Sequence, residues 1–81
     1  ADLAVDEAVR DRGIGTDLVH AFAREVGVRG ARRLYLEVRV SNEGARRFYH
    51  RLGFEIVSRR AGYYRKPLED AWSMGVDLPL G

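Results

Sequence analysis

The chain of 81 residues contains no cysteine, which excludes disulfide bonds and thiolate metal sites within it. Its two histidines, His20 and His50, are too few to close a zinc site without help from carboxylates. Lysine is also scarce, because Lys66 is the only one and arginine supplies the other basic side chains. No apolar run approaches the roughly 20 residues that a membrane span needs. We therefore expect no metal site, no membrane partner and a cytoplasmic location.

What remains is the composition of one small globular domain, residues 1–81, with 46% hydrophobic and 32% charged residues and a formal net charge of +2. The basic residues are spread along the chain, and this distribution argues against a nucleic-acid-binding surface. Basic and aromatic residues do alternate over residues 59–66. RNA binding by that segment is therefore a weaker alternative.

A turn that contains Gly13 and Gly15 links an apolar, strand-like run at residues 1–5 to a helical pattern. The pattern predicts a helix over about residues 13–28, since its apolar residues recur at a spacing of four. These residues are Ile14, Leu18, Phe22 and Val26, with Ala21 on the same side. The first N–H groups of a helix have no internal partners, and glycines let an anion approach them closely. The turn favours a pyrophosphate site with Arg10 and Arg12 at its rim, although a helix that simply follows a glycine is the alternative.

Residues 34–40 alternate with a period of two and predict a strand. One face carries Leu34, Leu36, Val38 and Val40, and the other carries Tyr35, Glu37 and Arg39. Strand, helix and strand in succession form a βαβ unit, so we expect the strands at residues 1–5 and 34–40 to be parallel neighbours. Ligands of such sheets bind at the carboxyl edge, where the glycine turn would lie.

A second helix is predicted from an N-cap at Ser41 or Asn42 to about Leu52, where Gly53 ends it. Its apolar stripe consists of Ala45, Phe48, Tyr49 and Leu52. Residues 54–58 predict a strand, residues 60–70 a loop, and residues 71–78 a last strand antiparallel to the one before. The predicted fold is therefore α/β in the order β-α-β-α-β-β. It has a mixed sheet with one parallel βαβ unit and a carboxy-terminal antiparallel pair.

Three motifs stand in order along the chain: Arg10-x-x-Gly13-x-Gly15, the run Asn-x-x-Ala-x-x-Phe-Tyr-x-x-Leu-Gly-Phe over residues 42–54, and Gly62-Tyr63-Tyr64 followed by Glu69-Asp70-Ala71 and Met74. Together they resemble the GNAT superfamily of acetyl-CoA-dependent N-acetyltransferases. The last motif is similar to that of the ribosomal-protein alanine N-acetyltransferase branch, which acetylates protein amino termini. The resemblance covers essentially all 81 residues but only the cofactor-binding half of the family fold. It implies that the family's amino-terminal half is absent.

The resemblance implies acetyl-CoA as co-substrate, no metal, and a primary amine as acceptor, foremost a protein or peptide N-terminus and otherwise a small amine. The residues that match the pantetheine-pairing strand, the pyrophosphate turn and the contact to the cofactor arm are Leu3, Ala4, Val5, Arg10, Asp11, Arg12, Gly13, Ile14, Gly15, Thr16 and Asn42. Helix capping is the alternative role of Asn42.

The same resemblance implies that Glu37 is the base, that Tyr49 is the acid, and that Tyr63 and Tyr64 close over the acceptor's terminus. A carboxylate beside the cofactor can take the proton that an α-ammonium group must lose before it attacks a thioester. The alternatives are an ion pair of Glu37 with Arg39 or another arginine, core packing of Tyr49, and a hydrophobic lid formed by the two tyrosines.

A second function stays open from the sequence, namely a CoA-binding half-domain that is inactive without a second chain or the missing half. Under this hypothesis an exposed strand at residues 1–5 favours pairing with another copy, and hence a homodimer.

Overall fold

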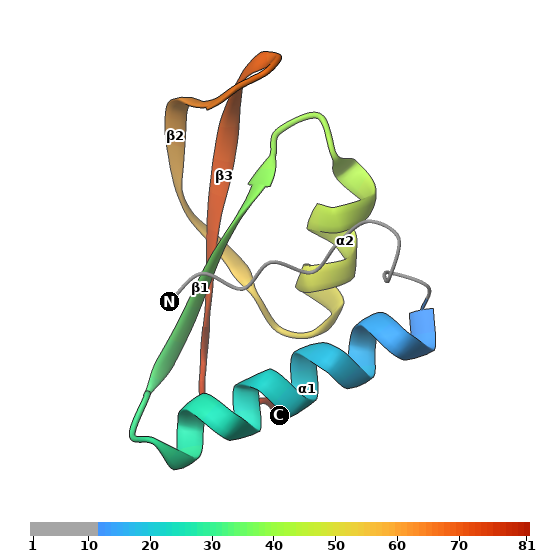
Figure 1. Ribbon diagram of the computed structural model, residues 1–81, viewed down its shortest axis with the longest axis vertical. Helices are drawn as coiled ribbons and strands as arrows, with labels where there is room; N and C mark the ends of the chain where they lie inside the picture. Colours follow the sequence, from blue (N-terminus) through green and yellow to red (C-terminus); the bar gives the residue numbers. More distant parts are fainter. Residues whose placement is uncertain (1–11) are drawn as a thin grey trace.

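The computed structural model describes the backbone of residues 12–81 and the side chains of residues 15–81. Its elements in chain order are α1 (Arg12–Val28), β1 (Arg33–Arg39), α2 (Glu43–Arg51), β2 (Glu55–Arg65) and β3 (Leu68–Asp77) (Figure 1). The strand predicted at residues 1–5, its parallel pairing and the dimer edge lie outside the described residues. Neither described helix combines the length and the apolar character that a bilayer crossing requires.

The three described strands form one antiparallel sheet in the order β1-β3-β2. The predicted antiparallel pairing of the last two strands is confirmed. The sequence did not predict that β3 inserts between β1 and β2. Along the β1–β3 ladder, Leu34 pairs with Val76, Glu37 with Ser73, and Arg39 with Ala71. This central place helps to bury consecutive β3 residues from Ser73, since β1 and β2 cover both edges of the strand.

The prediction of a loop over residues 60–70 is wrong. Strand β2 continues to Arg65 and β3 begins at Leu68, so that only Lys66 and Pro67 form the turn between them. Gly62 lies in an irregular part of the ladder, where the register shifts, and its φ is +61°. A glycine within a strand typically marks such a bulge. Glycine and proline therefore indicate a kink and a tight turn here, and the hairpin reaches beyond the end of β1 (Figure 1).

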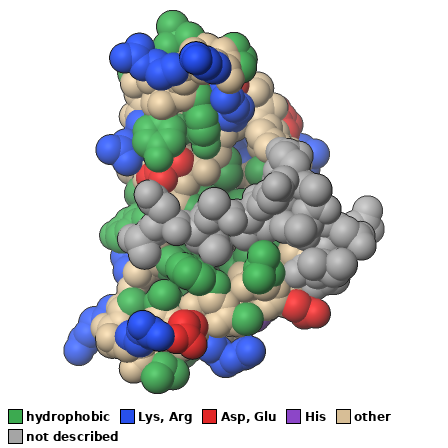
Figure 2. Space-filling view, viewed as in Figure 1, with side chains coloured by type: hydrophobic (Ala, Val, Ile, Leu, Met, Phe, Trp, Pro, Cys, Tyr) green, Lys and Arg blue, Asp and Glu red, His purple; other side chains and the backbone are tan. Residues whose placement is uncertain are grey.

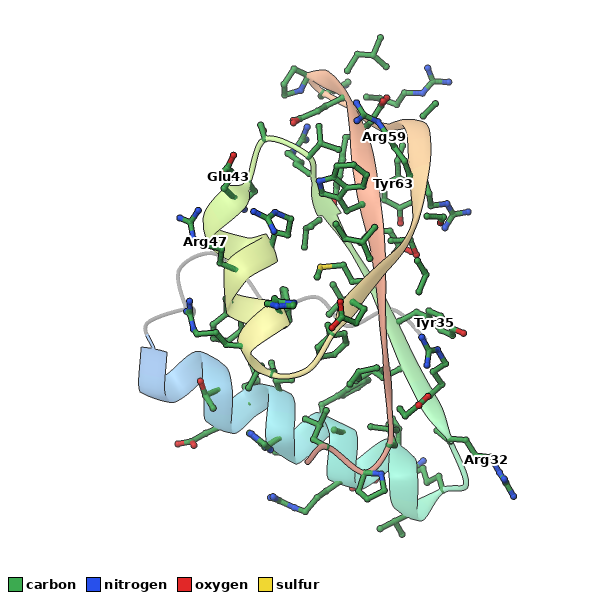
Figure 3. The ribbon with its side chains drawn as sticks, turned by 180° about the vertical axis from the view of Figure 1, so that it is seen from behind. Arg32, Tyr35, Glu43, Arg47, Arg59 and Tyr63 are labelled. Carbon is green, nitrogen blue, oxygen red and sulfur yellow. The ribbon has the colours of Figure 1, made fainter. Side chains whose placement is uncertain are left out.

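Both helices contribute to one core on the same face of the sheet. The alternation predicted for β1 is confirmed, because Leu34, Leu36 and Val38 are buried while Tyr35 is 40% exposed. Tyr35 points away from α2 (Figure 3). The fully buried large side chains are Phe54, Leu34, Leu36, Met74 and Val19. Because side chains alternate along a strand, Glu37 lies on the face of β1 opposite the helices.

Helix α2 follows its prediction closely. The Asn42 side chain caps it, since its Oδ1 accepts a hydrogen bond of 3.0 Å from the Ala45 N–H. Gly53 follows the helix with a φ of +101°, a conformation that glycine adopts without strain. Phe48 and Tyr49 of the predicted stripe are buried against the sheet.

The stripe predicted for α1 is wrong in part. Val19 and Ala23 are its most buried side chains, whereas Leu18 is 43% exposed and Ala21 is also exposed. Phe22 packs at the edge of the core. A strict spacing of four drifts around a helix of 3.6 residues per turn, so the predicted row began one position away from the buried face.

Candidate functional site

The carboxylate of Glu37, on β1, is contacted by side chains from both of the other described strands. Its side chain is 9% exposed. Arg60 Nη1 lies 3.3 Å from its Oε2, the Tyr63 hydroxyl 3.4 Å from its Oε1, and the Ser73 hydroxyl 3.4 Å from its Oε2. These distances exceed the 2.7–2.9 Å typical of strong charge-assisted hydrogen bonds. Glu37 is therefore enclosed by donors without being tightly held by any of them.

The two tyrosines predicted to close over a substrate lie on β2, next to Glu37. Their rings meet edge to face with centroids 5.0 Å apart. The Tyr64 hydroxyl donates a hydrogen bond of 3.3 Å to the backbone carbonyl of Glu37. Burial, and secondly the neighbouring Tyr63, raise the pKa of Tyr64 above its ordinary value. The structure thus brings Glu37, Tyr63 and Tyr64 together, as the sequence resemblance led us to expect of one site.

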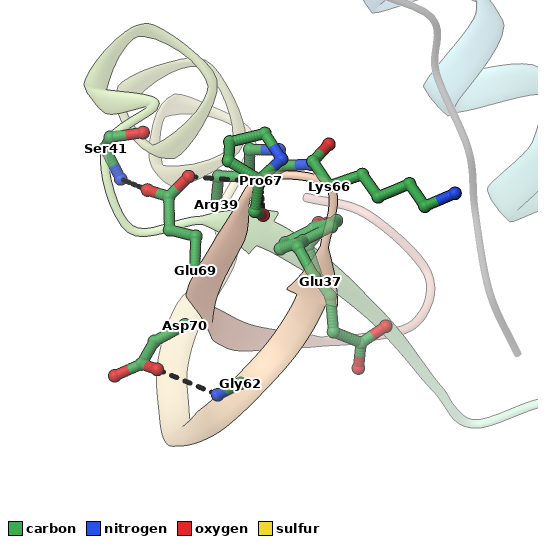
Figure 4. Close-up of polar contacts among 9 residues, drawn as sticks. Glu37, Arg39, Ser41, Gly62, Lys66, Pro67, Glu69 and Asp70 are labelled. Atoms are coloured by element: carbon green, nitrogen blue, oxygen red, sulfur yellow. Dashed lines mark hydrogen bonds and ion pairs between the residues drawn. The ribbon is translucent and has the colours of Figure 1, made fainter.

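Arg39 does not pair with Glu37. Its guanidinium contacts Glu69 at 3.2 Å and the backbone carbonyls of Lys66 and Pro67, at 3.2 Å and 3.1 Å (Figure 4). It also lies over the Tyr64 ring at 4.1 Å. Arg39 is therefore committed to the turn of the hairpin, and the arginine that pairs with Glu37 is Arg60.

Glu69 completes this network from the start of β3. It accepts a hydrogen bond of 2.7 Å from the Ser41 N–H (Figure 4). Hydrogen bonds from the side chain and backbone of Ser41, together with Arg39, hold the pKa of Glu69 below its ordinary value. The network fastens the hairpin to the segment between β1 and α2, and so fixes the strand that carries Tyr63 and Tyr64.

The predicted acid lies on the other side of the sheet. Tyr49 is 3% exposed and packs edge to face against Phe48 and Phe54, with centroids 5.0 Å and 5.4 Å away. It belongs to the core between the helices and the sheet, whereas Glu37 lies on the opposite face of β1. The predicted acid and the predicted base therefore lie on opposite faces of the sheet.

The predicted cofactor residues fall into three groups. Leu3, Ala4, Val5, Arg10 and Asp11 lie outside the described residues. Arg12, Gly13, Ile14, Gly15 and Thr16 form the start of α1, where Gly15 is buried and no acidic side chain occupies the first turn. The third group is Asn42, whose side chain caps α2. The first turn of α1 thus keeps the N–H groups and dipole that suit a phosphate.

Sequence reasoning missed Arg60 and Ser73. Ser73 faces Glu37 across the β1–β3 ladder, and Arg60 reaches it from the far strand of the sheet. Both contacts depend on β3 lying between β1 and β2, an arrangement for which the sequence gives no local signal. The one feature of the sequence that pointed to Arg60 is the alternation of basic and aromatic residues over residues 59–66. Basic side chains do gather at the hairpin end of the molecule (Figure 2).

Two other features of the described residues do not join this site. No group of three His, Cys, Asp or Glu side chains among them could hold a metal ion. A groove of about 560 Å³ lies between the carboxyl half of α1 and residues 78–80. Its lining includes His20, Arg24 and Leu80 but none of the predicted site residues.

Comparison with known proteins gives concordant matches. Residues 1–54 match the sequence profile of the acetyltransferase (GNAT) family. The ribosomal protein bS18-alanine N-acetyltransferase of Salmonella typhimurium is 40% identical over 81 residues, which cover 98% of this chain and 55% of that protein. The crystal structure of the ribosomal-protein-S18-alanine N-acetyltransferase from Escherichia coli matches with a TM-score of 0.75 at 35% identity, over 96% of this chain and 52% of that one.

A crystal structure of Arabidopsis thaliana NAA60 in complex with acetyl-CoA matches with a TM-score of 0.76 at 30% identity, over 93% of this chain and 44% of that one. The chain thus spans about half the length of the curated relatives and solved structures that it matches.

Proposed function

The chain belongs to the acetyltransferase (GNAT) family, and from this premise we propose that it transfers an acetyl group from acetyl-CoA to a protein N-terminal α-amine. The observation that carries the proposal is the nearly buried carboxylate of Glu37, enclosed by Tyr63, Arg60 and Ser73. The names of the relatives support the acceptor class, since they are N-acetyltransferases of alanine or of N-terminal α-amines. The complex of a similar protein with acetyl-CoA supports the donor.

The start of α1 would hold the pyrophosphate of acetyl-CoA through the backbone N–H groups near Gly13 and Gly15. Tyr63 and Tyr64 would form the wall against which the acceptor's terminus rests. The carboxylate of Glu37 then takes one proton from the α-ammonium group, so that the nitrogen gains a free electron pair. Holding that amine beside an already activated thioester supplies much of the rate enhancement.

The nitrogen forms a bond to the thioester carbonyl carbon, and the carbon–sulfur bond breaks with its electron pair on sulfur. The Tyr49 hydroxyl donates a proton to that sulfur, and the proton leaving the new amide nitrogen restores the phenol.

Substitution Glu37→Gln tests the base. Glutamine keeps the size of the side chain but cannot accept the proton, so we expect kcat/KM to fall about 100-fold or more. The loss should be largest at low pH, where nearly all of the acceptor is ammonium. The assay follows release of the CoA thiol with an N-terminal peptide from pH 6 to pH 10.

The matched control is Glu43→Gln, which removes an exposed carboxylate that pairs with Arg47 at 3.1 Å. It should leave the rate unchanged. If Glu37→Gln showed the same rate and pH profile as the unsubstituted protein, Glu37 would not be the base.

Substitution Tyr49→Phe tests the acid. Phenylalanine keeps the ring contacts with Phe48 and Phe54. We expect turnover to fall about 100-fold, with acetyl-CoA affinity unchanged within about twofold as measured by isothermal titration. A parallel loss of turnover and affinity would mean that Tyr49 only packs the core.

The alternative function is binding of acetyl-CoA without turnover. A thermal-unfolding titration with acetyl-CoA, and with NAD as control, separates the two. Free ligand at 100 times its dissociation constant should add roughly 2.7 kcal/mol to the free energy of unfolding. Stabilisation by acetyl-CoA without thiol release would favour the alternative. The homodimer and the cytoplasmic location stay predictions.

A further inference from the structure

The ion pair between Glu37 and Arg60 is strongly asymmetric. The Glu37 side chain is 9% exposed, whereas the Arg60 side chain is 54% exposed. Among the described residues, Arg60 is the one cation that contacts this carboxylate. A nearly buried carboxylate left without a cation is costly, whereas an exposed guanidinium that leaves it is taken up by water.

The two described arginines nearest to Arg60 in sequence or on the same face of β1 are held by other partners. Arg39 projects from the same face of β1, but Glu69 and the carbonyls of the hairpin turn already hold it. Arg59, the sequence neighbour, pairs with Asp70 at 2.9 Å and lies over the Trp72 ring. Within the described part of the chain, the charge balance of Glu37 therefore depends on Arg60.

Arg60 also has a place to remain when it releases the carboxylate. Its guanidinium lies 5.3 Å from the centroid of the Tyr63 ring. Its distance of 3.3 Å to Glu37 is long for a charge-assisted hydrogen bond. The head group can therefore leave the carboxylate and stay over the ring, where a cation is favoured.

We propose that Arg60 is a displaceable counter-ion, which occupies Glu37 until the α-ammonium group of the acceptor takes its place. The inference rests on the proposed function and adds a selection rule to it. Because the arriving group must replace a cation at a nearly buried carboxylate, the site takes a charged primary ammonium and rejects a neutral, blocked terminus. Arg60 is a positioning residue in this scheme, since it acts through Glu37.

The decisive experiment compares the affinity of two peptides for the unsubstituted protein and for Arg60→Gln, by isothermal titration in the presence of CoA. The peptides share one sequence, and one has a free α-amine while the other is N-acetylated. Arg60→Gln should bind the free-amine peptide about fivefold more tightly, the scale of one partly exposed ion pair. Its affinity for the acetylated peptide should not change.

Arg59→Gln is the matched control, because Arg59 makes the same two kinds of contact with Asp70 and Trp72. It should bind both peptides as the unsubstituted protein does. Arg60→Met, which keeps an unbranched apolar side chain, serves as a second neutral variant if Arg60→Gln does not fold.

An unchanged or weaker affinity for the free-amine peptide would overturn the proposal, and so would an equal gain for both peptides, which would indicate a wider site instead of a freed charge. Binding and turnover separate this proposal from the function on which it rests. A protein that shows the selective gain but releases no thiol would refute acetyl transfer and keep the displacement. A protein that transfers acetyl groups without the gain would do the reverse.

Discussion

A methyl group at Gly75, near the end of β3, should destabilise the protein while Tyr35 is present. The two residues are register partners in the β1–β3 ladder. A Cβ at Gly75 would lie 2.9 Å from Cε1 and 3.0 Å from Cδ1 of Tyr35, and 3.0 Å from a guanidinium nitrogen of Arg33. Carbon atoms in good contact are about 3.5–4.0 Å apart. The substitution Gly75→Ala therefore forces the ring, the strand or both to move by about half an ångström or more.

The cost can be bounded from the surroundings of the ring. Tyr35 is 40% exposed, so it can swing outward, but it then leaves its place beside the Arg33 guanidinium, 5.3 Å from its centroid. Overpacking of this kind costs about 1–2 kcal/mol. For a domain of this size such a loss lowers Tm by about 5–15 °C. Glu37 and Ser73 lie on the same face of the sheet, because they pair two positions along the ladder from Tyr35 and Gly75.

Thermal unfolding followed by circular dichroism, on a double-mutant cycle of Gly75→Ala and Tyr35→Ala, measures the effect. With the ring removed, Gly75→Ala should cost almost nothing, and the coupling between the two sites should reach about 1 kcal/mol. Gly27→Ala is the control, because a Cβ there meets no atom within 4 Å. Gly27 lies in the last turn of α1 without a positive φ, so the substitution should raise stability by at most about 0.5 kcal/mol. An equal cost of Gly75→Ala with and without the Tyr35 ring would refute the reasoning.

Two further predictions concern the segment between β1 and α2. Asn42→Ala should lower the free energy of unfolding by about 1 kcal/mol because it removes the helix cap, whereas Asn42→Asp keeps the hydrogen-bond acceptor and the stability. If Asn42 also donates a hydrogen bond to acetyl-CoA, the Asn42→Asp protein should be stable but should bind acetyl-CoA more weakly in a titration. Glu69→Gln should lower Tm at neutral pH, since hydrogen bonds from Ser41 and Arg39 lower the pKa of the folded carboxyl. That stabilisation is present above the unfolded pKa of about 4.3 and is lost as pH falls through the folded pKa. The difference in Tm between the two proteins should therefore disappear in acid. A difference that persisted at pH 2 would mean that the carboxylate charge is not its cause.

The parts of the fold that could be predicted from sequence are those with local causes. A capping asparagine, an apolar stripe and a following glycine are all contained within the stretch that forms α2. The alternation of β1 likewise needs only its own residues to assign Leu36 to the core and Glu37 to the other face. In the hairpin, by contrast, Gly62 and Pro67 predict a loop where the structure has a bulge and a tight turn. A bulge within a strand and a loop have similar composition, so the sequence does not distinguish them.

The candidate site divides in the same way. Glu37, Tyr63 and Tyr64 could be singled out by resemblance, and the structure places them in contact. Arg60 could not be assigned, because the sequence contains many arginines and nothing in it distinguishes the one that reaches Glu37. The sequence also offered Arg39 as the partner, and the network around Glu69 excludes it.

The amino-acid sequence by itself determined the class of the chain, the span and faces of α2, the faces of β1 and the family motifs, because capping and side-chain periodicity act over a few residues. Only the tertiary structure decided that β3 lies between β1 and β2, and with it which serine and which arginine meet Glu37. Strand pairing joins residues far apart in the chain, and its register is set by burial of one whole face. The counter-ion of the proposed base is therefore a property of the assembled sheet.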